Sequence, residues 1–279
     1  MNKYIIALLL SGIVMVVPFF LGIILPFIKP TIKKKSYIYL YSLSSGFILV
    51  LGLFGLIAHP LMHYLENSKV NETQKNLKAI GIAIGASTLG MGAAFITRHF
   101  LHNDKKEIHS NHQNHKHEDY IFNIKELENG KTKITVIVLL GLHKLPAGIS
   151  LGIFASSKDG IYFATIISLI IHMIPETLTI YYRQIEIGIK KWKALINSTI
   201  IQAILIPFIF IGVSIVSVGE WVKPFVLTSA GSLLVFTAIV ELIPEFIDHD
   251  FTHNKWHKTI LLFIIGFILS LSIMIIHKH

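Results

Sequence analysis

Two related sequence motifs in neighbouring apolar segments contain the residues best suited to binding or catalysis. The first runs from His143 to Ser150 (HKLPAGIS), and the second, 29 residues later, runs from His172 to Thr179 (HMIPETLT). Each has a histidine, a proline three residues later, and then an alanine or a glutamate. On a helix this last position lies one turn beyond the histidine on the same face. The pattern therefore pairs His172 with Glu176, and His143 with Ala147.

The prolines add a third kind of polar group near each motif, namely a free backbone carbonyl oxygen. Pro146 and Pro175 have no N–H, so the carbonyl oxygen four residues earlier loses its helical donor. Imidazole nitrogen, carboxylate oxygen and carbonyl oxygen are ligands that zinc and ferrous iron accept. Our first hypothesis is therefore a metal ion held inside apolar segments.

The composition indicates a membrane protein. It is 53% hydrophobic and 15% charged, which is far from the balance of a soluble domain. The chain has no cysteine, so any metal must be held by His, Glu, Asp or backbone oxygen. The net charge of +9 comes from basic residues at the ends of apolar runs, and we therefore expect no nucleic acid partner.

We predict an all-α integral membrane protein with eight transmembrane helices. Runs of about 20 apolar residues can cross a bilayer, and we interpret the first run as a retained span and not as a signal peptide. Seventeen basic residues lie in loops on one side of this topology and seven on the other. The positive-inside rule then puts both termini outside. The eight runs are 4–28, 37–65, 77–100, 133–155, 160–182, 194–218, 222–247 and 258–277.

This division gives four regions: spans one to three (1–100), a polar loop (101–131), the central spans four and five (132–192), and spans six to eight (193–279). We expect the loop to be cytoplasmic and disordered. It can be interpreted as a weak metal-collecting tract or as a solvated charged linker, and we favour the former. Its candidate ligands are His102, His109, His112, His115 and His117.

Ionisable residues inside spans cost about 2.5–3.5 kcal/mol each at mid-bilayer, so each is a functional candidate. We expect His143 and His172 to share a site. For Glu176 we favour a ligand role, and the alternatives are protonation or pairing with Lys144. His63 and Glu245 could also be solvated near a membrane face. The candidates for pathway or auxiliary roles are His59, His63, Lys144, Glu241 and Glu245.

Four of the pathway candidates form two pairs with four-residue spacing, beside Pro60 in the second span and beside Pro244 in the seventh. These spans occupy mirrored places if the chain is divided into three spans, then two, then three. Such a 3+2+3 arrangement is typical of an inverted repeat around a central pair of helices. We therefore expect the polar residues to converge on spans four and five.

These motifs resemble those of the ZIP family of divalent metal transporters, and the resemblance covers essentially the whole chain. In that family the fourth span typically reads His-Asn-x-Pro-Glu-Gly and the fifth (His/Gln)-x-x-Pro-Glu. The matching residues are His143, Pro146 and Gly148 in the first motif, His172, Pro175 and Glu176 in the second, and the stretch 241–245 (ELIPE) in the seventh span. Three positions differ: Lys144 replaces the Asn, Ala147 replaces the first Glu, and Ile206 stands where an acidic residue is common.

The resemblance implies a divalent metal cation transporter that moves zinc, iron, manganese or cadmium towards the cytoplasm. It implies one metal held by His143, His172 and Glu176, with water or a freed carbonyl completing the shell, and with the Lys144 ammonium where a second cation would lie. It also implies an elevator-like movement of spans one, four, five and six against the others. The metal is then the transported substrate, no organic cofactor is needed, and the partners are the metal ion and the lipid bilayer, with a homodimer allowed.

Two other functions compete with transport. Ala147 and Lys144 would suit a ZIP-like metal-binding sensor or partner with impaired transport. A zinc-dependent intramembrane hydrolase could use Glu176 or Glu241 as its general base, but the chain has no His-Glu-x-x-His. We therefore favour a transporter that is not an enzyme. Frequent Ile, Lys and Asn suggest an AT-rich genome and a bacterial inner (plasma) membrane.

Overall fold

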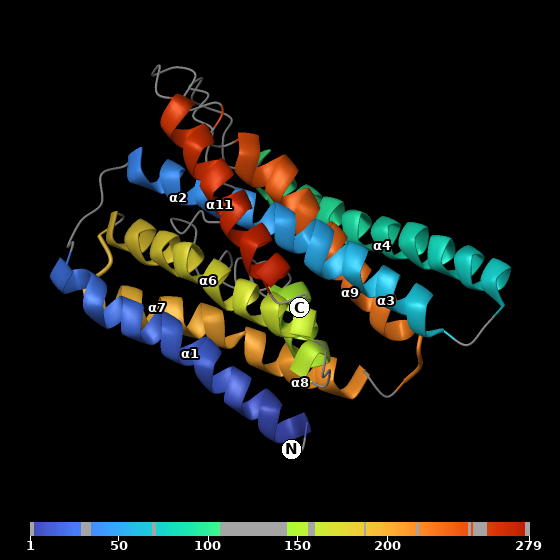
Figure 1. Cartoon of the computed structure of the whole chain (residues 1–279). Helices are drawn as coiled ribbons and strands as arrows, with labels where there is room; N and C mark the ends of the chain where they lie inside the picture. The colour runs from blue at the N-terminus through green and yellow to red at the C-terminus, as the bar shows by residue number, and fades with distance from the viewer. Residues whose placement is uncertain are drawn as a thin grey trace.

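The computed structural model describes residues 3–28, 35–68, 71–106, 144–155, 160–186, 188–215, 218–244, 247 and 256–276. These residues form helices and short turns, with no strand among them (Figure 1). The elements are α1 (Lys3–Ile28), α2 (Lys35–Val50), the π-helix η1 (Leu51–Ala58), α3 (His59–Asn67), α4 (Glu72–Lys106), α6 (Gly160–Glu186), α7 (Lys191–Ala203), α8 (Leu205–Ile215), α9 (Val222–Phe236), the π-helix η3 (Thr237–Leu242) and α11 (Trp256–Ile276). A further short apolar helix spans Lys144–Ala155.

Seven helical stretches of the described chain are long and apolar enough to cross a membrane. The prediction of an all-α multi-pass membrane protein is confirmed. The expected fourth span is described only over Lys144–Ala155, so the count of eight stays a prediction. Some helix ends lie beyond the predicted ranges. α6 runs four residues past 182, to Glu186. α4 continues to Lys106, six residues into the expected loop, because residues 101–106 contain no glycine or proline.

The helices form two groups that meet at α6. In one group α1 packs against α6, α7 and α8; in the other α2 packs against α11, and α9 packs against α4 and η1. Figure 1 shows the first group across the lower part of the view and the second group above it. α6 contacts α2, η1 and α11 across the boundary. Side chains on α6 can therefore face both groups.

Pairs of glycines allow backbones within each group to approach closely. A Cβ added to Gly152 in the short helix would lie 2.0 Å from a backbone oxygen of α8, and one added to Gly212 in α8 would lie 2.2 Å from a backbone oxygen of the short helix. Gly46 in α2 and Gly266 in α11 meet in the same way, at 2.1 Å and 2.2 Å. Small residues at such crossings are how membrane helices gain packing contacts without a hydrophobic driving force.

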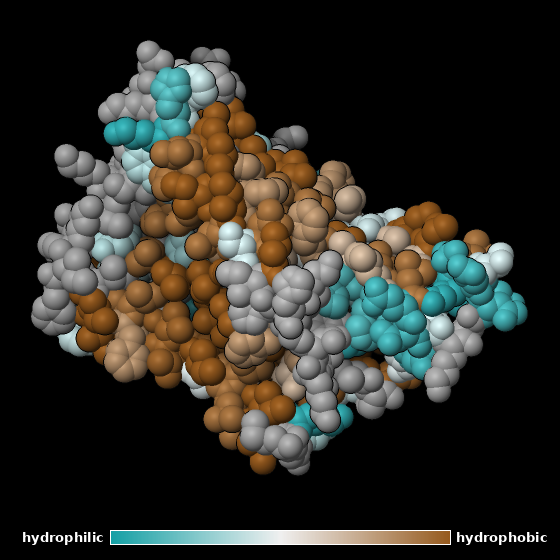
Figure 2. Space-filling model, viewed as in Figure 1, coloured by the Kyte–Doolittle hydropathy of each residue, from teal (hydrophilic) through white to brown (hydrophobic). Residues whose placement is uncertain are grey.

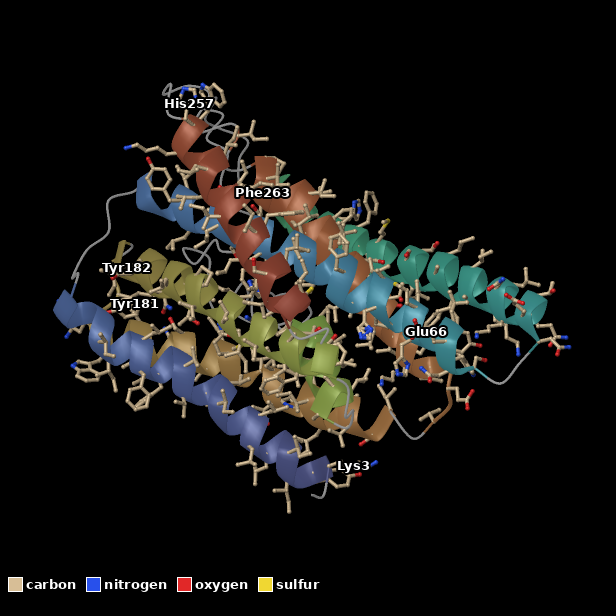
Figure 3. All side chains as sticks on the ribbon, viewed as in Figure 1. Lys3, Glu66, Tyr181, Tyr182, His257 and Phe263 are labelled. Atoms are coloured by element: carbon tan, nitrogen blue, oxygen red, sulfur yellow. The ribbon has the colours of Figure 1, made fainter. Side chains whose placement is uncertain are left out.

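The surface of the molecule is suited to lipid. Large apolar side chains are exposed along α1, α4 and α11, among them Leu8, Ile84 and Leu261. In Figure 2 an apolar surface covers the middle of the molecule, and hydrophilic residues lie towards its extremities. Figure 3 shows Lys3 and Glu66 at one end of the bundle and Tyr182 and His257 at the opposite end. In the predicted topology, Lys3 and Glu66 lie on one side of the membrane and Tyr182 and His257 on the other, which agrees with this arrangement. Which side faces the cytoplasm stays a prediction.

Prolines mark the places where three helices change their hydrogen bonding. Pro60 lies in the first turn of α3, directly after η1, and Pro244 follows η3. Each π-helix shows an i→i+5 bond at its C-terminal end: His59 N donates to Phe54 O at the end of η1, and Ile243 N donates to Ala238 O at the end of η3. In the third case the α-helical hydrogen bonding is interrupted at Ile204, between α7 and α8, while its backbone dihedrals stay right-handed helical, because Pro207 cannot donate to Ala203 O.

The glycine crossing of α2 and α11 predicts a stability difference between two Gly→Ala variants. Gly46→Ala should lower the free energy of unfolding by about 1–3 kcal/mol, since its Cβ would overlap a backbone oxygen that cannot rotate away. Gly81→Ala in α4 meets nothing within 4 Å, so it should be neutral or stabilising by up to about 1 kcal/mol through helix propensity. Thermal unfolding in detergent measures both, and equal midpoints would contradict the crossing.

Candidate metal centre

His172 and Glu176 lie one turn apart near the middle of α6, which contains Pro175 in its interior. Both side chains are buried, with 6% and 4% of their surface exposed. His172 Nε2 lies 3.9 Å from Glu176 Oε2. The predicted pairing of an imidazole and a carboxylate on one helix face is therefore present in the bundle interior.

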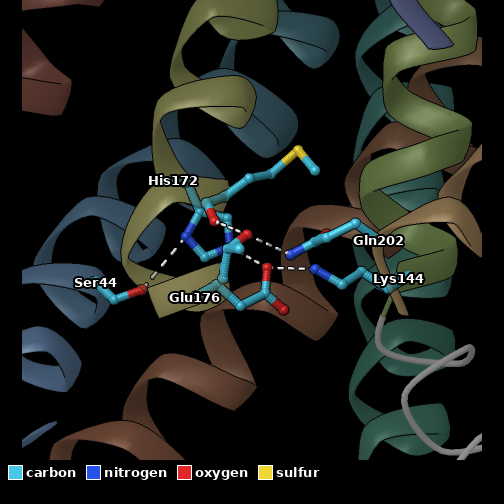
Figure 4. Close-up of polar contacts among 7 residues, drawn as sticks. Ser44, Lys144, His172, Glu176 and Gln202 are labelled. Atoms are coloured by element: carbon cyan, nitrogen blue, oxygen red, sulfur yellow. Dashed lines mark hydrogen bonds and ion pairs between the residues drawn. The ribbon is translucent and has the colours of Figure 1, made fainter. Parts of the chain in front are cut away.

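Lys144, in the short helix, forms an ion pair with this carboxylate. Its ammonium donates a hydrogen bond to Glu176 Oε2 (Figure 4), and only 3% of either side chain is exposed. Burying an ion costs several kcal/mol unless a partner compensates for the lost water. Each charge is therefore the reason that the other can be buried here. This pairing is one of the two alternatives to a ligand role that the sequence suggests for Glu176.

His172 also contacts the second group of helices. Ser44 Oγ on α2 lies 3.4 Å from His172 Nδ1, at the long limit for a hydrogen bond. The other ring nitrogen, Nε2, is the one that faces Glu176. A hydroxyl on Nδ1 orients the ring and leaves Nε2 as the nitrogen for a metal, which is the usual arrangement around ligating histidines. The site thus lies at the boundary between the two groups.

A chain of hydrogen bonds links α7 to the same turn of α6. Thr177 Oγ1 donates to Met173 O at 2.7 Å, and Gln202 Nε2 donates to Thr177 Oγ1 at 3.0 Å. Gln202 and Thr177 are both buried. This chain holds α7 against the residues that directly follow His172 and Glu176.

The third ligand that the resemblance implies, His143, lies outside the described residues. Within the described part of the chain, no group of three or more His, Asp or Glu is placed to hold a metal. The ligand set His143, His172 and Glu176 therefore stays a prediction. Ala147 is partly buried and packs against the hydrophobic core, so this position offers the site only a methyl group.

The auxiliary candidates lie on other elements. His59 and His63 are partly buried on α3, with ring centroids 6.2 Å apart, and α3 packs against η1, α9 and α4. Glu241 belongs to η3 and His102 to α4, but their side chains are not among those described. Outside the described residues lie Glu245, His109, His112, His115 and His117.

Three polar residues around the site were not predicted from the sequence: Ser44, which lies against His172, and Thr177 and Gln202, which are hydrogen-bonded to each other beside Glu176. All are neutral, whereas the search of the spans considered ionisable residues. A signal was available for Gln202, which is an amide between Ile201 and Ala203 in an apolar span. An amide in such a place needs hydrogen-bond partners on another helix.

Comparison with models of known protein families gives a match. The family model described as "ZIP Zinc transporter" matches residues 95–274, which is more than half of the chain and includes the short helix, α6 and α7. No curated protein matches the chain.

The ion pair predicts a loss of stability when only one charge is removed. Lys144→Met keeps a long side chain but leaves the Glu176 carboxylate buried without its ion-pair partner. We expect about 3–5 kcal/mol of destabilisation in metal-free buffer, measured by thermal or denaturant unfolding in detergent.

The double variant Lys144→Met with Glu176→Leu is the matched control. It removes both charges, so it should recover most of the lost stability. A double variant as unstable as Lys144→Met would show that the loss comes from packing and not from an unpaired carboxylate.

Proposed function

Because the chain belongs to the ZIP zinc transporter family, whose members move divalent metals, we propose that it carries zinc or a similar divalent ion towards the cytoplasm through a single-metal site on α6. The candidates other than zinc are iron, manganese and cadmium. The ion is the transported substrate and not a cofactor. The proposed ligands are His143, His172 and Glu176.

The buried ion pair on Glu176 is the observation that supports this proposal most directly. A carboxylate near the middle of an apolar helix needs a cation beside it, and here an ammonium is that cation. A divalent ion could replace the ammonium at the same oxygen, with His172 Nε2 3.9 Å away as its next ligand. Carboxylate and imidazole together suit zinc, ferrous iron and manganese.

A single metal is the stoichiometry that the neighbouring residues favour. A second divalent ion beside Glu176 would need more anionic ligands. Ala147 provides only a methyl group, and the Lys144 ammonium already lies on the carboxylate and would repel a second cation.

We propose a 3+2+3 inverted repeat in which α1, the short helix, α6, α7 and α8 move as one body against the others. Side-chain hydrogen bonds connect helices within each group, as between Gln202 and Thr177 in one and between Ser232 and Ser87 in the other. The metal site lies on α6 at the boundary, where Ser44 reaches His172. Sliding at this boundary would expose the site to each side in turn. Both termini face outward in this proposal.

A metal-binding sensor is the second candidate, and the same ion pair favours it. The Lys144 ammonium on the Glu176 carboxylate would suit a protein that binds metal only when Lys144 is displaced and that does not transport it. Metal flux distinguishes the two functions, because a sensor binds metal without carrying it across a bilayer.

We expect His172→Ala and Glu176→Ala to abolish metal uptake into proteoliposomes, because each removes a ligand from a one-metal site. A loss of one such ligand should lower uptake by at least about tenfold. Uptake is measured for zinc, iron, manganese and cadmium side by side, with expression and folding checked by gel filtration.

Exposed residues of the same types provide the controls. His257→Ala in α11 and Glu220→Ala in the turn before α9 remove an imidazole and a carboxylate away from the site, and both should transport normally. Unchanged uptake in His172→Ala or Glu176→Ala would eliminate the site, and binding without flux in the native chain would establish the sensor.

The stoichiometry is tested by restoring the family residues at two positions. Lys144→Asn together with Ala147→Glu removes the ammonium and adds a carboxylate, so the bound metal should rise from one towards two ions per chain. Equilibrium dialysis with metal analysis measures this ratio. An unchanged ratio would mean that these positions do not determine the number of metals.

A further inference from the structure

Gln202 is a fully buried amide at the end of α7. Its neighbours in the sequence from Ile200 to Ile206 are otherwise apolar. An amide inside a membrane bundle must be compensated by hydrogen bonds or by a ligand, because no water reaches it there. The partners of its two polar atoms therefore indicate what it does.

The hydrogen bonds around Thr177 determine how this amide is oriented. A threonine hydroxyl has one hydrogen to donate, and Thr177 uses it on Met173 O at 2.7 Å. Its partner at 3.0 Å must then be a donor, which makes it Nε2 of Gln202. The oxygen, Oε1, is directed elsewhere and has no hydrogen-bond donor among the described residues.

The amide lies against the turn of α6 that carries the candidate ligands. Thr177 directly follows Glu176, and Met173 directly follows His172. Figure 4 shows the side chains of Gln202 and Lys144 both approaching this turn, and Lys144 brings its ammonium to Glu176. A buried carbonyl oxygen without a donor is destabilising, and a cation at this turn would compensate for the missing hydrogen bond.

A second glutamine on the same two helices shows the ordinary structural role. Gln184 on α6 is also fully buried. Its Nε2 donates to Ala194 O at 3.3 Å and to Ser198 Oγ at 3.1 Å, while its Oε1 accepts from Asn197 at 2.8 Å. Both ends of this amide are used in joining α6 to α7. Gln202 joins the same helices with its nitrogen alone.

We propose that Gln202 Oε1 is a neutral oxygen ligand of the transported metal ion and helps to set which ion is preferred. This inference rests on the proposed function, since it adds a fourth protein ligand to that site. The oxygen comes from α7, within the same helix group as α6, so it would travel with the metal. A carbonyl oxygen favours harder ions such as manganese over softer ions such as cadmium.

Gln202→Met tests this role because it keeps the length of the side chain and replaces the oxygen ligand by a thioether. The ratio of cadmium to manganese affinity should rise by about tenfold, since thioethers favour softer metals. The measurement is competitive binding of the two metals to the full chain in detergent, followed by uptake of both in proteoliposomes.

Gln184→Met is the matched control. It removes a buried amide from the same helix pair, so it should lower thermal stability without changing the metal preference. A Gln202→Met chain with the native cadmium-to-manganese ratio, or with the same shift as Gln184→Met, would overturn the inference. Failure of the native chain to bind or carry any metal would instead overturn the proposed function.

Discussion

A carboxylate that stays ionised inside an apolar bundle needs a cation beside it, and the arrangement around α6 follows from that constraint. The cost of removing Glu176 from water is several kcal/mol, and Lys144 offsets it from the short helix. Because the ammonium reaches the carboxylate from another element, the pair also fixes how the short helix lies on α6. His172 shares the same turn. One electrostatic requirement thus brings together the residues from which we derive the function.

A second constraint acts on the backbone, because in lipid every N–H and C=O must find a partner within the protein. Pro60, Pro175 and Pro207 each remove a donor from the interior of a span. Two of these prolines coincide with altered geometry, namely a π-helix before Pro60 and a break before Pro207. In α6 the helix continues through Pro175, so His172 and Glu176 stay one turn apart on one helix face. The places where backbone bonding changes are therefore close to the polar side chains.

The spans were predictable because hydropathy and length depend only on local sequence. The predicted range 160–182 agrees with α6, and 4–28 agrees with α1. Pairing of His172 with Glu176 was predictable for the same reason, since it follows from helix periodicity. The contacts of Ser44 and Gln202 were not, because they depend on how far neighbouring helices are shifted along one another. The pairing of Lys144 with Glu176 was predictable in part. Their opposite charges suggested an ion pair, but whether the two side chains meet depends on how the short helix packs on α6.

The ion pair also bears on how a metal site could empty and reset. When a divalent ion leaves, Glu176 would keep its negative charge. Moving that unpaired charge through the apolar boundary between the helix groups would cost several kcal/mol. With Lys144 on Glu176, the empty site has no net charge from this pair, so the desolvation cost of the unloaded movement is reduced. On the proposed function, the same ammonium would compete with the metal and weaken its binding, which would favour release on the far side. On the proposed function, a residue that removes a second metal site would therefore assist the transport of the first metal.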